Sequence, residues 1–173
     1  MKTSIRYYFL CAILLAGLNI VYAQNIKQDK KAAKIEAIKT MVNNANYIFR
    51  ANYVNPQRGG NKALTSDYDL KVTKDTITAF LPYYGRAYVA PINPSEGGIK
   101  FTSTNFIYTT KNNKAGSWDI LIKPKLNSNN DLKDVQQLRL NISSGGYASL
   151  SVISTNREPI SFNGYIEEIK VKN

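Results

Sequence analysis

The chain has 173 residues, a formal net charge of +11, no histidine and a single cysteine, Cys11. Without histidine, the Ser-His-Asp triad, the Cys-His pair and the usual zinc sites are excluded as a basis for activity. The length suits one domain with its own hydrophobic core.

The first 23 residues have the pattern of a secretory signal peptide. Lys2 and Arg6 precede an apolar run over 8–22, and a small-x-small site ends at Ala23. Cleavage after Ala23 leaves 173 − 23 = 150 residues with no cysteine and a net charge of 11 − 2 = +9. The run is shorter than the roughly 20 residues of a membrane span. We therefore expect a periplasmic or secreted protein whose mature chain has no transmembrane segment, with an uncleaved anchor as the alternative.

After a short polar linker, the spacing of apolar residues predicts a helix over 29–45. Its apolar stripe consists of Ala32, Ile35, Ile38, Val42 and Ala45. Lysines crowd the first turns, and a basic amphipathic helix can lie on an anionic membrane. The alternative, which we favour because the stripe has only three large aliphatic residues, is a helix packed on its own domain.

From Tyr47 onward the apolar period changes from helical to two, which predicts strands. Tyr47, Phe49, Ala51 and Tyr53 form the first inward-facing set. Lys74-Asp75 is expected to be a hairpin turn, and 126–134 a polar loop. The expected strands cover 47–53, 68–72, 77–81, 86–90, 99–103, 105–110, 118–122, 138–142, 148–152 and 160–166.

The strands follow one another through short connections, with no helical crossover after residue 45. Parallel neighbours need crossovers of a dozen or more residues, so the pattern favours an antiparallel meander. The predicted fold is mainly β, a lipocalin-like up-and-down barrel, with a β-sandwich as the alternative. We expect residues 24–173 to form a single domain, with the N-terminal helix covering one end or side.

Tyrosine and arginine gather in one short stretch, where Tyr83, Tyr84 and Tyr88 surround Arg86. Aromatic rings beside a fixed guanidinium can hold a small amphipathic or anionic ligand, so these four residues are the predicted ligand site. The alternative is that these tyrosines are ordinary strand residues that are half-buried, with part of the side chain in solvent.

Carboxylates are the remaining candidates for chemistry. Asp67 and Asp69 would share one face of a strand, whereas the adjacent Glu167 and Glu168 would face opposite sides. Paired carboxylates can hydrolyse glycosides, and oxygen ligands can hold Ca²⁺. Solvated strand ends are the simpler interpretation, so we expect no enzyme, no metal and no cofactor.

Several short motifs together carry a resemblance. The run over 81–87 (LPYYGRA), with 97–101, 118–120, 156–157 and 160–164, resembles the exported family known as domain of unknown function 4251, found mainly in Bacteroidetes. The similarity covers nearly the whole mature chain. It implies an exported, envelope-associated protein and no established activity. In bacteria of that kind Asp75-Thr76-Ile77 resembles an O-glycosylation signal, with Thr76 as the acceptor.

The leading functional hypothesis is a non-enzymatic module that binds a small amphipathic or anionic envelope ligand. Export, a closed β architecture and positive charge motivate it, although scattered lysines can also serve solubility alone. The alternative is a structural or interaction protein bound to an envelope protein, without a small ligand. Nucleic acid is a poor partner for an exported protein. An interior fully packed with aliphatic and aromatic side chains would weigh against an enclosed ligand.

Overall fold

The computed structural model describes residues 28–88, 97–113, 116–125 and 135–169. The expected signal peptide, the loop over 126–134 and part of the predicted strand over 86–90 therefore lie outside the described residues. The chain divides into two compact units, residues 1–37 and 38–173. The helix crosses this boundary, and the second unit contains the whole β-sheet.

The described part of the helix covers residues 28–43, close to the predicted 29–45. Ile38 and Val42 are buried as expected, but Ala32 is exposed and Ile35 only half-buried, so the buried stripe is shorter than predicted. The helix ends in a Schellman motif. Ala45 takes the left-handed conformation (φ 46°), and the amide of Asn46 donates to the carbonyl of Met41 at 3.0 Å. No helix in the described part of the chain is long and apolar enough to cross a membrane.

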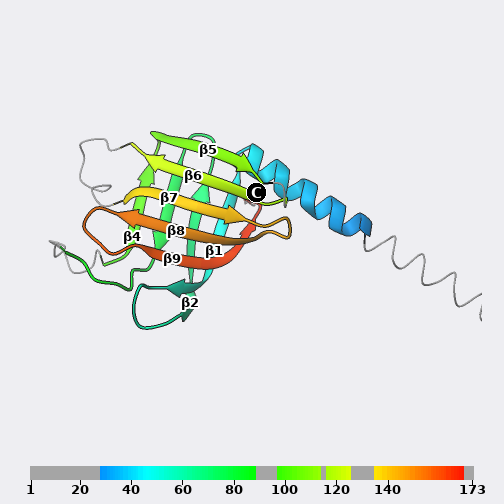
Figure 1. Ribbon diagram of the computed structural model, residues 1–173. Coiled ribbons are helices and arrows are strands. Elements are labelled where there is room, and N and C mark those ends of the chain that lie inside the picture. Colours follow the sequence, from blue (N-terminus) through cyan, green and yellow to red (C-terminus); the bar gives the residue numbers. More distant parts are fainter. Residues whose placement is uncertain (1–27, 89–96, 114–115, 126–134, 170–173) are drawn as a thin grey trace, which may run out of the picture. The chain divides into compact units, whose positions relative to one another are not determined.

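Nine strands in the described residues form one antiparallel sheet. They are β1 (Tyr47–Asn55), β2 (Lys62–Val72), β3 (Ile77–Leu81), β4 (Ile99–Ser103), β5 (Phe106–Asn112), β6 (Trp118–Pro124), β7 (Val135–Ile142), β8 (Tyr147–Ser154) and β9 (Ile160–Glu167). The strand order is β4-β3-β2-β1-β9-β8-β7-β6-β5. Each neighbouring pair is consecutive in sequence except β1 and β9, whose pairing closes the meander into a nearly complete barrel (Figure 1). This confirms the barrel and not the two-sheet sandwich.

β4 and β5 are the two ends of the strand order, and they do not pair with each other. Because every neighbouring pair is antiparallel and the strand number is odd, these two strands run in the same direction. Only Thr104 and Asn105 separate them, so residues 99–112 form one long strand with a bend, pairing first with β3 and then with β6. The Ser103 hydroxyl fixes the bend by donating to the carbonyl of Asn105 at 2.9 Å. Figure 1 shows β5 to β9 crossing over the strands behind them.

Alternating apolar residues from almost every strand fill the inside of the sheet, as the period of two predicts. The largest fully buried side chains are Tyr47, Phe49, Phe162, Leu70, Ile77, Leu81, Ile120, Ile122, Leu138, Leu140, Ile142 and Leu150. Edge strand β5 is the exception, since none of its residues is fully buried. Ile38 and Val42 of the helix are buried in the same unit, and the carbonyl of Val42 accepts a hydrogen bond from Tyr108 at 3.1 Å.

One inward position was predicted wrongly. Tyr53 is 51% exposed, and its neighbour Val54 is buried instead. The cause is a β-bulge: Asn52 is an extra residue of β1 between the pairs formed with Gly164 and Asn163 of β9. A bulge inserts one residue into the alternation. Beyond it, the residues that face inward are those that would otherwise face outward.

Gly164 is required where the bulge meets β9. A Cβ atom at this position would overlap the carbonyl oxygen of Arg50, which is rigid backbone. We expect Gly164→Ala to lower the free energy of unfolding by about 2 kcal/mol or more, because β1 and β9 would have to separate. Denaturant unfolding measures this. Gly145→Ala is the matched control, since its Cβ would make only ordinary contacts, and an equal loss in both variants would contradict the clash.

A pair of tyrosines, Tyr47 buried and Tyr108 half-buried, links β1 to β5. The Tyr47 and Tyr108 hydroxyls lie 3.3 Å apart, and Tyr108 donates onward to Val42, so Tyr47 is the donor to Tyr108. Burial raises the pKa of both phenols, that of Tyr47 well above its ordinary value.

These raised pKa values predict a loss of stability in alkali. Above about pH 10 the unfolded chain releases phenolic protons that the folded chain keeps, so stability falls as the pH rises. Tyr47→Phe should cost about 1 kcal/mol at neutral pH through the lost hydrogen bond. It should also make the alkaline decline shallower in unfolding curves measured at increasing pH. The exposed Tyr53→Phe is the control, and an unchanged decline in Tyr47→Phe would refute the assignment.

Candidate functional site

The predicted tyrosine site lies where the segment after β3 meets the turn between β8 and β9. Ala87 and Arg157 form an isolated antiparallel bridge. The amide of Tyr88 donates to Asn156 at 2.7 Å, and that of Glu158 donates to Arg86 at 3.0 Å. We call residues 83–88 together with 156–158 the clasp. The prediction of a strand over 86–90 is wrong for its described residues. Their partner is the turn around Arg157, which forms one isolated bridge with Ala87 and no ladder.

Tyr83 holds the clasp together. Its hydroxyl lies 2.9 Å from the carbonyl oxygen of Arg86 and 3.1 Å from that of Glu158. The guanidinium of Arg157 lies over the ring, 5.2 Å from its centroid, and donates to the carbonyl of Gly98 at 3.0 Å. Burial, with the Glu158 carboxylate nearby, raises the pKa of the Tyr83 phenol. The Tyr83 hydroxyl is thus engaged with the backbone of the clasp, and a role of Tyr83 in ligand contact stays a prediction.

Two glycines let the backbone come close enough for these contacts. A Cβ atom on Gly85 would lie 2.6 Å from the Tyr83 hydroxyl, and one on Gly98 would lie 2.8 Å from the carbonyl oxygen of Leu81. The motifs noted in the sequence over 81–87, 97–101 and 156–157 therefore converge in space. Their shared physical role is to build the clasp.

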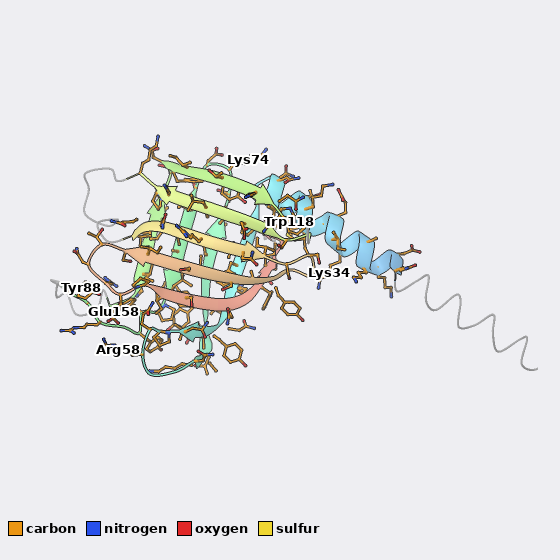
Figure 2. The ribbon with its side chains drawn as sticks, in the orientation of Figure 1. Lys34, Arg58, Lys74, Tyr88, Trp118 and Glu158 are labelled. Atoms are coloured by element: carbon orange, nitrogen blue, oxygen red, sulfur yellow. The ribbon has the colours of Figure 1, made fainter. Side chains whose placement is uncertain are left out.

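The other three predicted residues point into solvent around the clasp. Tyr84 is 39% exposed and Tyr88 63% exposed. Arg86 joins the clasp through its backbone, and the residue as a whole is exposed. Lys62, at the start of β2, places its ammonium 4.8 Å from the centroid of the Tyr84 ring. We call Lys62, Tyr84, Arg86 and Tyr88 the basic tyrosine patch; Figure 2 shows Tyr88 and Glu158 at the end of the sheet opposite Trp118.

Sequence reasoning missed Lys62, which comes from a different strand and reaches the patch only through the fold. Thr76 lies in the β2–β3 turn as expected and is partly exposed. Its backbone is held by Thr73, whose hydroxyl and amide both donate to the Thr76 carbonyl. Glycosylation of Thr76 stays a prediction.

The carboxylates take part in a second cluster, on the outer face of β1, β2 and β9. Arg50 of β1 donates through Nε to Glu167 at 2.8 Å and through Nη1 to Asp69 at 2.9 Å. Asp67 lies beside this pair at the edge of an open recess. Glu168 is exposed. Sequence reasoning missed Arg50, although a charged residue inside a strand of alternating apolar positions marks an outward site.

The charges in this cluster shift one another's titration. The hydrogen bond to Glu167 raises the pKa of Arg50. Burial raises the pKa of the Asp69 carboxyl and outweighs the opposing effect of Arg50, and the negative charge of Asp67 adds to the rise. Within the described residues, no group of three or more histidine, cysteine, aspartate or glutamate side chains is placed to hold a metal ion.

Comparison with known proteins identifies the family. Residues 29–166 match the profile of the family described as Domain of unknown function (DUF4251). The chain belongs to this family. A crystal structure of a DUF4251 protein from Bacteroides eggerthii DSM 20697 has a similar fold, with a TM-score of 0.56 and 15% sequence identity. The similarity covers 80% of the present chain and 91% of that chain. No curated protein matches.

The hydrogen bonds of the Tyr83 hydroxyl in the clasp of this DUF4251 protein lead to a testable prediction. Tyr83→Phe removes the hydroxyl that joins the two segments and should cost about 1 kcal/mol of stability. Limited proteolysis should then cut the 83–88 segment faster than in the wild type, because the clasp opens more often. Tyr84→Phe is the matched control at the neighbouring, more exposed position. Equal cleavage rates in the two variants would show that the Tyr83 hydroxyl does not secure the clasp.

Proposed function

We propose that this DUF4251 protein is an exported, non-enzymatic protein that binds an anionic component of the cell envelope through the basic tyrosine patch. The observation that carries the proposal is the arrangement of Lys62 and Arg86 with two exposed tyrosine rings around a fixed backbone clasp.

The filled interior favours a surface site over an enclosed one. The inward positions of the sheet are occupied by aliphatic and aromatic side chains that exclude solvent. A ligand carried inside the barrel would have to displace this packed core, at a cost of several kcal/mol. An exposed patch needs no such rearrangement.

The chemistry of the patch suits an anion with an apolar neighbour. A guanidinium donates two parallel hydrogen bonds to a phosphate or carboxylate, and an ammonium adds a compact charge. The tyrosine rings offer apolar faces and hydroxyls at the same site, as side chains at membrane–water boundaries do. Holding the backbone of Arg86 in the clasp reduces the conformational entropy lost on binding.

The export part of the proposal rests on the signal-peptide pattern over 1–23 and on the positive charge of the chain. An exported basic protein meets anionic head groups and acidic polysaccharides before any other abundant polyanion.

Vesicle sedimentation tests the proposal. The wild-type protein should bind phosphatidylglycerol vesicles, bind phosphatidylcholine vesicles far less, and release as salt rises. The double variant Lys62→Gln, Arg86→Gln should bind phosphatidylglycerol at least about tenfold more weakly, because each basic residue at the surface contributes about 1 kcal/mol.

The control removes the same charge elsewhere. Lys71 and Lys123 are exposed on β2 and β6, outside the patch, so Lys71→Gln, Lys123→Gln keeps the net charge of the first double variant. Equal weakening in both double variants would mean that net charge alone drives binding and would refute the patch. No binding by the wild type would refute the anionic ligand.

A further inference from the structure

An open recess of about 360 Å³ lies on the outer face of the sheet, and none of the residues of the basic tyrosine patch lines it. Its walls are Arg50, Ala51 and Asn52 of β1, Leu64 to Tyr68 of β2, and Tyr165 and Glu167 of β9. The volume lies within the range of small-molecule sites in proteins. Nothing in the proposed function uses these residues.

The recess is formed where the pairing of β1 with β2 is irregular. Between the pairs Ala51–Tyr68 and Tyr53–Ala63, β1 has one residue and β2 has four, Leu64 to Asp67. Those residues leave the β1 ladder and are mostly exposed. Bulges often lie next to binding sites, and here Thr65, Ser66 and Asp67 line the recess.

The polar floor of the recess is held in place before any ligand arrives. Arg50 is fastened on both sides by Asp69 and Glu167, which come from the two neighbouring strands. Tyr68 is stacked on Phe80 of β3, with ring centroids 5.6 Å apart. Side chains already fixed in this way lose little conformational entropy on binding.

The charges identify the class of ligand. In the lining, Asp67 and Glu167 outnumber the single guanidinium of Arg50, whose Nε and Nη1 groups are already engaged with Glu167 and Asp69. An anion would therefore be repelled, although the protein as a whole is basic. Hydroxyls of Thr65 and Ser66, the amide of Asn52 and the carboxylates offer donors and acceptors for a ligand rich in hydroxyl groups. Tyr165, which is 39% exposed, is the aromatic residue of β9 at the recess.

We propose that this recess binds a saccharide that carries no anionic group, with Tyr165 against the ring and Asp67 accepting hydrogen bonds from its hydroxyls. The site is independent of the basic tyrosine patch and has the opposite electrostatic preference.

Calorimetric titration of the full mature chain tests the proposal with three probes, chitotetraose and maltotetraose as neutral saccharides and tetragalacturonate as an anionic one. At least one neutral probe should bind, and tetragalacturonate should bind more weakly than that probe. Tyr165→Ala should weaken the binding about tenfold, the scale of one lost aromatic contact. Asp67→Asn, a second variant at an exposed position, should also weaken it.

Tyr147→Ala is the matched control. Tyr147 pairs directly with Tyr165 across β8 and β9 and is 75% exposed, but it does not line the recess. It should change the affinity less than about twofold. Thermal melts should show all three variants folded. Failure of both neutral probes, equal or tighter binding of tetragalacturonate, or equal losses in the two tyrosine variants would overturn the proposal. Phosphatidylglycerol binding by Tyr165→Ala should stay unchanged, which separates this site from the basic tyrosine patch.

Discussion

The close approach of Gly164 to the carbonyl oxygen of Arg50 is the constraint on which the rest of the sheet depends. It allows β1 to carry an extra residue and still pair with β9, and that pairing closes the barrel. The same bulge brings Val54 into the core in place of Tyr53. Beside it, β2 departs from β1 and leaves the recess on the outer face. One glycine therefore supports closure, core register and a surface feature together.

Much of this architecture can be predicted from the sequence, because inward-facing positions alternate strictly in most strands. Leu138, Leu140 and Ile142 are buried as their spacing predicts, and so are Ala148, Leu150 and Val152. The errors occur where the backbone leaves regular pairing. A bulge reverses the alternation at Tyr53, and the segment after β3 pairs with a turn instead of a strand. Neither event has a local pattern, since each is decided by a partner distant in the chain.

The candidate sites show the same limit. Short stretches of the sequence are enough to select Tyr84, Arg86 and Tyr88 as candidate ligand contacts. They are also enough to select Asp67 and Asp69 as paired carboxylates. They assign Tyr83 to ligand contact, and the fold uses its hydroxyl to join two segments of backbone. They miss Lys62 and Arg50, which meet their partners only across strands. Residue chemistry can be predicted from the sequence, but which residues stand together is set by strand register.

The order of the strands also bears on how the protein folds. Every ladder among the described strands except one joins consecutive strands, so most pairings form between residues close in sequence. The exception is β1 with β9, where Ile48 meets Glu167. Closing so long a loop costs more conformational entropy than any hairpin here, and folding slows as contacts become less local. We therefore expect the hairpins within β1–β4 and within β5–β9 to form early and the β1–β9 ladder to form last. Formation of the β1–β9 ladder would then be the rate-limiting step of folding.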